Sequence, residues 1–334
     1  MASEFDAAYI QEASEGRRTT STVLSLTTGT GYSVYKSTII PAIKRAEREV
    51  ILVTCFWAAS VTRDLINEAL VYLSQKALSS SKKISVRICF SSASLARNML
   101  LPTPKEGEQY PSSSWRKIGL PRPEELKGLT LRVSRKFFWP FGIIHSKYVV
   151  VDRKFAIFPS CNVSWERWYE VAVLCSGPIV DQLLSFHGQF WDNGRSLAAA
   201  SERAASKNLL LHLLLLVMVV LVTAGTTTPA SIQRLRRRAE QMDSDSLLQV
   251  SYFDSDDGRG TQHPVLREIE QYRDTVPVKL HAKVTIVDGE MILLGSGNMD
   301  AASWKTSQEL GILIESRAVV DEFMKLWTYE KFGV

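Results

Sequence analysis

The stretch that decides the fold is His145-Ser-Lys-Tyr-Val-Val-Val-Asp152, which returns at an offset of 136 residues as His281-Ala-Lys-Val-Thr-Ile-Val-Asp288. The same offset pairs two polar residues that follow each block, Ser160 with Ser296 and Asn162 with Asn298. Polar positions kept in register, with apolar residues between them, indicate an internal duplication. The chain is therefore expected to fold as two related halves.

The histidine and lysine of each block suit chemistry at a phosphoryl group. Because side chains alternate along a strand, His145 and Lys147 share one face, and so do His281 and Lys283. An imidazole can act as nucleophile or general acid near neutral pH, and a lysine can neutralise a phosphate oxygen. The serine and asparagine of each half are expected to donate hydrogen bonds to the same phosphate. Two half-sites then permit a double displacement that needs no metal.

The two blocks resemble the paired His-x-Lys-x4-Asp motifs of the phospholipase D superfamily. The second copy, with Gly295-Ser-Gly-Asn298 after its aspartate, fits the family pattern, whereas the first has Pro159 where the family usually places glycine. The resemblance implies an α/β fold of two duplicated α-β-α lobes with mixed sheets. It also implies an enzyme without a cofactor, acting on a phospholipid or another phosphodiester.

The resemblance further assigns roles to individual residues. The catalytic set comprises His145, Lys147 and Asp152 in the first half and His281, Lys283 and Asp288 in the second. Phosphate binding is assigned to Ser160, Asn162, Ser296 and Asn298. Glu170 and Glu309 resemble the family's downstream acid, which can hydrogen-bond a catalytic histidine and select its tautomer. The two aspartates are supporting residues, and for them a turn function is at least equally expected.

Composition describes an ordinary globular chain. It has 334 residues, 45% hydrophobic and 22% charged, with a net charge of +5. This charge is compatible with anionic substrates but too mild to indicate a nucleic-acid surface. The four cysteines lack metal-binding spacing, which favours a reducing compartment. The amino-terminal residues carry acids without an apolar core, so we expect a cytoplasmic protein rather than a secreted one.

The chain is expected to divide into a loose arm at 1–30, a first lobe at 31–195 and a second lobe at 196–334. Helices are predicted at 36–49, 62–77, 179–191 and 319–329, strands at 50–56 and 84–90, and a long loop at 100–127. His187, His212 and His263 have no partner at ligand spacing and are interpreted as structural.

The second lobe is shorter than the first. Its apolar run 209–224 would correspond to the strand 84–90, and nothing corresponds to 49–77. We infer that this lobe lacks its opening strand-helix unit, or that the piece was lost from the gene model. The run is also shorter than the roughly 20 residues of a membrane-spanning helix, so a buried strand is favoured over a membrane segment. A membrane segment would be flanked by the basic cluster at 234–238.

The leading hypothesis is a phosphodiesterase that hydrolyses phospholipids through a phosphohistidine. His145 is taken as the nucleophile and His281 as the acid, following the commoner assignment in the family, because the sequence itself is symmetric on this point. The alternatives are a nuclease of the same superfamily and an inactive protein that binds phosphate or lipid. We expect a monomer whose lobes form an intramolecular pseudo-dimer, with peripheral membrane contact and with nucleic acid as the less favoured partner.

Overall fold

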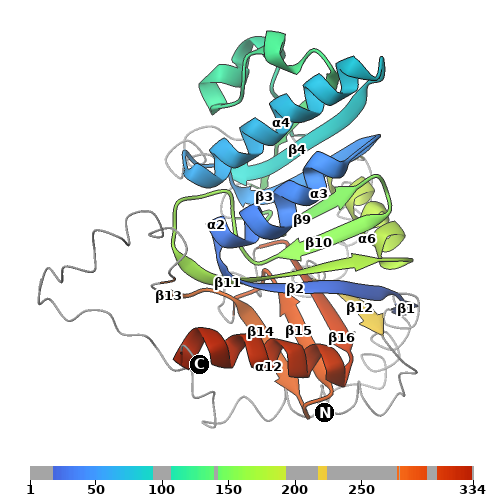
Figure 1. Ribbon diagram of the computed structural model, residues 1–334, viewed down its shortest axis with the longest axis vertical. Coiled ribbons are helices and arrows are strands. Elements are labelled where there is room, and N and C mark those ends of the chain that lie inside the picture. The colour runs from blue at the N-terminus through green and yellow to red at the C-terminus, as the bar shows by residue number, and fades with distance from the viewer. Residues whose placement is uncertain are drawn as a thin grey trace, which may run out of the picture.

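The computed structural model describes residues 18–92, 107–138, 142–192, 217–223, 277, 279–298 and 307–332. Two large mixed sheets and the helices around them make up most of this part of the chain (Figure 1). A two-stranded antiparallel sheet of β7 (Phe137–Phe138) and β8 (Gly142–Ile143) precedes the first motif. The expected α/β class is confirmed. The predictions for 1–17, for His212 and His263, for the basic cluster at 234–238 and for the boundary near 195 lie outside the described residues.

The larger sheet carries the first motif near its middle. Its strand order is β13 (Lys279–Leu280), β11 (Trp168–Ser176), β10 (Phe155–Pro159), β9 (Tyr148–Val151), β3 (Glu49–Phe56), β4 (Ile84–Ser92), β6 (Leu129–Arg135) and β5 (Glu108–Gln109), with β2 (Thr22–Thr30) also paired to β11. The strands β3, β4 and β6 run parallel, whereas β9 is antiparallel to β3. The core of β3 is buried on both faces, as expected for a strand covered on both sides.

Helices cover one face of this sheet. The helical segments α2 (Gly31–Val34), η1 (Tyr35–Ile39), α3 (Ile40–Arg45) and α4 (Val61–Ser79) contribute to a core that includes alternate residues of β3. Ser60 caps α4 by accepting a hydrogen bond from the backbone of Arg63, at 3.2 Å. The expected loop 100–127 contains two short helices, η2 (Ser112–Ile118) and η3 (Pro123–Leu126). Figure 1 shows them at the end of the molecule that carries α4.

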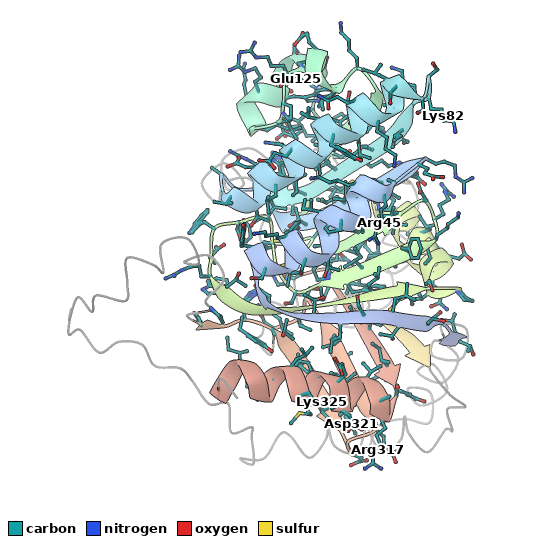
Figure 2. The ribbon with its side chains drawn as sticks, viewed as in Figure 1. Arg45, Lys82, Glu125, Arg317, Asp321 and Lys325 are labelled. Atoms are coloured by element: carbon teal, nitrogen blue, oxygen red, sulfur yellow. The ribbon has the colours of Figure 1, made fainter. Side chains whose placement is uncertain are left out.

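The smaller sheet carries the second motif at its edge. Its order is β1 (Arg18–Thr20), β12 (Val217–Thr223), β16 (Glu309–Glu315), β15 (Met291–Gly295) and β14 (Lys283–Val287). The helix α12 (Arg317–Phe332) follows β16. Figure 2 shows Arg317, Asp321 and Lys325 on the outer side of α12, and Phe323 on its other side is buried in the core.

The two sheets share one hydrophobic core. It joins the other face of the larger sheet and α6 (Ile179–His187), followed by η4 (Gly188–Asp192), with residues of β15, β16 and α12. Ile51 and Val53 of β3 belong to this core, together with Ile292 and Ile312 of the smaller sheet. Apolar residues of the two halves are therefore buried by each other.

Two predictions for the segments that flank the lobes are wrong. Residues 18–30, expected in a loose arm, form β1 and β2, and β2 pairs antiparallel with β11 along its length. The run 209–224 contains β12, which is a strand as favoured, but it does not correspond to β4. The strand β12 lies parallel to β16, whereas β4 lies on the other side of the motif strand, beyond β3. Among the described residues, no helix is long and apolar enough to cross a membrane.

Candidate active site

Each motif begins in a short connection and continues into the first strand of a β-hairpin. The hairpin of β9 and β10 turns at Asp152 and Arg153, and that of β14 and β15 turns at Asp288 and Gly289, with positive φ at all four residues. The Asp152 carboxylate accepts hydrogen bonds from three successive backbone N–H groups, at residues 47–49 and 2.8 to 2.9 Å. Asp152 therefore acts as a turn residue that ties the hairpin to the start of β3. Asp288 lies exposed in its turn.

The motif histidines are held by the glutamates of the opposite halves. His145 Nδ1 lies 2.8 Å from the Glu309 carboxylate, and His281 Nδ1 lies 2.8 Å from that of Glu170. Both glutamates are buried. A carboxylate at this position accepts the Nδ1 proton, which leaves the Nε2 lone pair for chemistry. The pairing is crossed, so neither half alone orients its own histidine.

The backbone repeats the crossing. The N–H of His145 donates to the carbonyl of Gln308 at 2.8 Å, and the N–H of His281 donates to that of Tyr169 at 3.0 Å. Each acceptor immediately precedes the glutamate that binds the same histidine ring. The short strand β13 extends this contact by pairing parallel with β11. Backbone and side chain of each histidine are therefore anchored to one strand of the other half.

The serines occupy a different position from the one expected. Ser160 Oγ donates to the Glu170 carboxylate, and Ser296 Oγ donates to that of Glu309 at 2.6 Å. The backbone N–H of the residue after each glutamate donates to the same hydroxyl, at 2.9 and 3.0 Å. A hydroxyl has one proton, which is engaged here by the glutamate. We therefore correct the phosphate-binding assignment: both serines orient the carboxylates that orient the histidines.

Each lysine is directed toward the histidine of its own half. Lys147 Nζ donates to the carbonyl of His145 at 2.7 Å, and Lys283 Nζ donates to that of His281 at 2.5 Å. Lys147 is buried, and burial lowers its pKa against the opposing charges of Glu309 and Glu170. The two lysines place positive charge beside both rings, as a phosphate site requires.

The asparagines and the proline complete the comparison of the halves. Asn162 Oδ1 accepts a hydrogen bond from the backbone of Phe56 at 3.3 Å, and both Asn162 and Asn298 are half-buried. Pro159 ends β10 in the register that Gly295 has in β15, since the following serines make equivalent backbone bonds, Ser160 to the strand β11 and its counterpart to β16. Proline at this position therefore leaves the strand register unchanged.

Electrostatics differ between the two histidines. Burial and the charge of Lys147 lower the pKa of His145 to about 4, against the opposing effect of its bond to Glu309. Burial also lowers the pKa of His281, and its bond to Glu170 opposes that shift. His145 is therefore neutral over the physiological range, with its Nδ1 proton on the side of Glu309.

The two half-sites form one electrostatic centre. The charge of Lys283 lowers the pKa of His145, and that of Lys147 lowers the pKa of His281. Burial raises the pKa of Glu309, but His145 and Lys147 outweigh it and hold that pKa below its usual value. Groups from both halves thus act on each other directly, as required for two histidines to serve one substrate.

Comparison with known proteins finds a family match in the second half of the chain. A family model described as "Cardiolipin synthase, PLD-like domain" matches residues 230–328, which include the whole second motif and Glu309. This part of the chain is similar to a PLD-like domain. The match includes the second motif, and the first motif lies outside it.

Similarity to a solved structure extends over most of the chain. The phosphatidylserine synthase of Haemophilus influenzae Rd KW20 matches with a TM-score of 0.50 at 12% identity, covering 94% of this chain and 89% of that chain. Nuc from Salmonella typhimurium, a phospholipase D family member, matches at 16% identity with a TM-score of 0.32, covering 51% of this chain and 96% of its own. At such identities the first likeness concerns the fold alone. No curated protein matches the sequence.

Sequence reasoning missed site residues that differ between the halves. Ser146 Oγ donates to the Gln308 side chain at 2.8 Å, and both residues are buried, yet their counterparts are Ala282 and Tyr169. The ring of Trp168 contacts that of His281, with centroids 4.6 Å apart. A search for repeated polar positions cannot find such residues. The sequence signal that could have found them is their position next to the motif histidine or close to the downstream glutamate.

Two buried thiols also lie close to the site. The charge of Lys147 acts on Cys55 and on Cys161, and Cys161 directly follows Ser160 in the chain. Burial raises the pKa of Cys55 to about 11 and that of Cys161 well above the usual thiol range. Both thiols therefore remain neutral and add no charge beside the lysine.

Proposed function

We propose that this protein cleaves phosphodiesters, with phospholipids as the substrate class, through a phosphohistidine formed on His145. The observation that supports the proposal most directly is the crossed pair of histidine-glutamate contacts. Each contact engages Nδ1 and leaves Nε2 for a reacting group, and the two rings share one field of two lysines. Nucleophile and acid would thus come from different halves.

The chemistry follows from the protonation states. The neutral His145 uses its Nε2 lone pair to attack phosphorus, while the bond from phosphorus to the leaving oxygen breaks. His281 gives its Nε2 proton to that oxygen. Glu309 lies against the ring that becomes positive, and the lysines compensate the charge on the phosphate oxygens. A water molecule then gives its proton to His281 and attacks phosphorus, and the phosphorus-nitrogen bond breaks.

The test is an assay of short-chain phosphatidylcholine and phosphatidylglycerol in water that contains a primary alcohol. A covalent intermediate partitions between phosphatidic acid and the phosphatidyl alcohol, so both products are expected. Neither product should form with His145→Asn. Single-stranded DNA serves as the competing substrate, and preferential cleavage of it would favour a nuclease. Binding of anionic vesicles without turnover of any substrate would favour an inactive lipid-binding protein.

The intermediate can be trapped directly. The phosphorus-nitrogen bond of phosphohistidine breaks in acid, so the reaction should not be quenched with acid. The labelled enzyme should be isolated under alkaline denaturing conditions after incubation with ³²P-labelled substrate. We expect label in the native chain and in His281→Asn with a leaving group that needs no proton. If label were lost only in His281→Asn, His281 would be the nucleophile and His145 the acid.

A further inference from the structure

The two motif histidines have different surroundings, although the motifs are repeated. His145 is 7% exposed, whereas His281 is half-buried. The positions two residues before the glutamates are also unlike: Trp168 stands before Glu170, and the matching residue before Glu309 is Ser307. The duplication therefore places an aromatic residue two positions before Glu170 and a serine two positions before Glu309.

That ring lies against His281. The centroids of the Trp168 and His281 rings are 4.6 Å apart, and their planes are inclined by 41°. The face of an indole attracts a cation within about 6 Å, so this contact stabilises the imidazolium more than the neutral imidazole. A protonated His281 would therefore be held more firmly than a neutral one.

The charged groups around His281 do not all favour a proton. Glu170 favours it through the 2.8 Å contact with Nδ1, whereas Lys283 and Lys147 oppose it. Lys279 lies 5.4 Å from the Trp168 ring centroid, and its exposure lets solvent screen its repulsion. Burial opposes the proton as well. An acid at this position thus needs support beyond its carboxylate.

We propose that Trp168 is a positioning residue that keeps a proton on His281, and so makes His281 the acid and His145 the nucleophile. This inference rests on the proposed phosphodiester cleavage. In the first step the His281 Nε2–H bond breaks and its proton goes to the leaving oxygen, while His145 bonds to phosphorus. In the second step water returns a proton to the same nitrogen as its oxygen replaces His145. Trp168 acts on the ring of His281, which alternates between its protonated and its neutral state.

The first test needs no turnover. The variants Trp168→Phe and Trp168→Leu both keep an apolar side chain over His281, but only phenylalanine keeps an aromatic face. The pKa of His281 is followed by NMR of the imidazole in the full-length chain, with its signal assigned from His281→Asn. We expect the phenylalanine variant to titrate about half a pH unit above the leucine variant.

Trp165→Leu is the matched control, because Trp165 is 67% exposed and close in sequence to Trp168. It should leave the His281 titration at the native value. Equal His281 pKa values in the phenylalanine and leucine variants would overturn the proposal, as would an equal shift in the control.

The second test uses leaving groups. A diester that releases p-nitrophenolate needs little proton donation, whereas one that releases a simple alcohol depends on it. Relative to Trp168→Phe, the leucine variant should lose about threefold more kcat/KM with the alcohol leaving group than with p-nitrophenol. Equal losses would remove the link to acid catalysis.

If the native chain cleaves neither diester, the proposed function is wrong. The titration still decides whether Trp168 holds the proton on His281.

Discussion

The residues of the site act as two linked chains rather than as two independent motifs. A serine orients a glutamate, and that glutamate orients the histidine of the other half, from Ser296 through Glu309 to His145 and from Ser160 through Glu170 to His281. The motif histidine thus depends on residues remote in sequence. At this scale the downstream acids matter as much as the motifs themselves.

Removing one carboxylate should separate positioning from binding. In Glu309→Gln the neutral amide replaces the carboxylate whose negative charge fixes the tautomer of His145. We therefore expect kcat to fall by about 10²- to 10⁴-fold. Substrate KM should change little. Glu322→Gln, an exposed change on α12, is the control and should retain native kcat. A normal kcat in the Glu309 variant would show that the contact is only structural.

The buried His145 should also make stability depend on pH. Its pKa is about 4 in the folded chain against 6.5 ordinarily, so the unfolded chain binds the proton more tightly. The free energy of unfolding should therefore fall as pH decreases from 6.5 to 4, by about 3 kcal/mol from this group. The lowered pKa of Glu309 contributes in the same direction, lost as pH falls below its usual value.

Urea unfolding of the native chain and of His145→Asn, at several pH values between 4 and 7, measures this effect. The quantity compared is the change of the unfolding free energy with pH, not the unfolding free energy itself. The variant should show a shallower loss across the window. Parallel slopes would mean that His145 is not held neutral by the fold.

At the scale of elements, the hairpins carry the motif residues and must be anchored. The Asp152 carboxylate performs this for the first hairpin through three backbone N–H groups that precede or begin β3. Asp152 also has a φ of +53°, a conformation that asparagine and aspartate tolerate better than alanine. The aspartate of the first motif is therefore explained by turn geometry.

Asp152→Ala should destabilise the fold by about 3 kcal/mol, because it leaves backbone donors unpaired and places alanine at positive φ. Asp152→Asn keeps the shape and one acceptor, so its effect should be intermediate. Chemical denaturation measures both, with Lys154→Ala, an exposed change in the same turn, as the control. An alanine variant of native stability would contradict the anchoring function.

At the scale of the whole molecule, the halves should unfold together. The shared core contains Ile51 of the first half with Ile292 and Ile312 of the second, and β1 and β13 cross between the sheets. Neither half buries its apolar face alone. We expect one transition, with fluorescence, circular dichroism and calorimetry coinciding.

Ile292→Ala tests this coupling, because Ile292 is fully buried in the shared core. It should lower the free energy of unfolding by about 2 to 5 kcal/mol, and Ile292→Val by about 1 kcal/mol, while the single transition is retained. Two separated transitions in the native chain or the alanine variant would contradict cooperative unfolding.

The sequence predicted the duplication, the α/β class and the helices and strands that flank the first motif. It succeeded there because apolar periodicity and repeated polar residues are local properties of the chain. It was wrong about residues 18–30, because short, Ser/Thr-rich strands carry little pattern of their own. It was also wrong about the partner of β12, because an apolar run does not specify which strand it pairs with. The pairing of these strands depends on which sheet edge is within reach.

The repeated motif by itself singled out the two histidines and the two lysines, because polar residues repeated in register indicate a duplicated site. Only the tertiary structure decided which glutamate serves which histidine, because that choice follows from two strands crossing between the sheets. It also decided that Ser160 and Ser296 donate to carboxylates, and that Trp168 distinguishes His281 from its copy. The histidine-glutamate contacts join residues 164 and 111 positions apart, and Trp168 breaks the repeat, so neither is visible in a linear comparison.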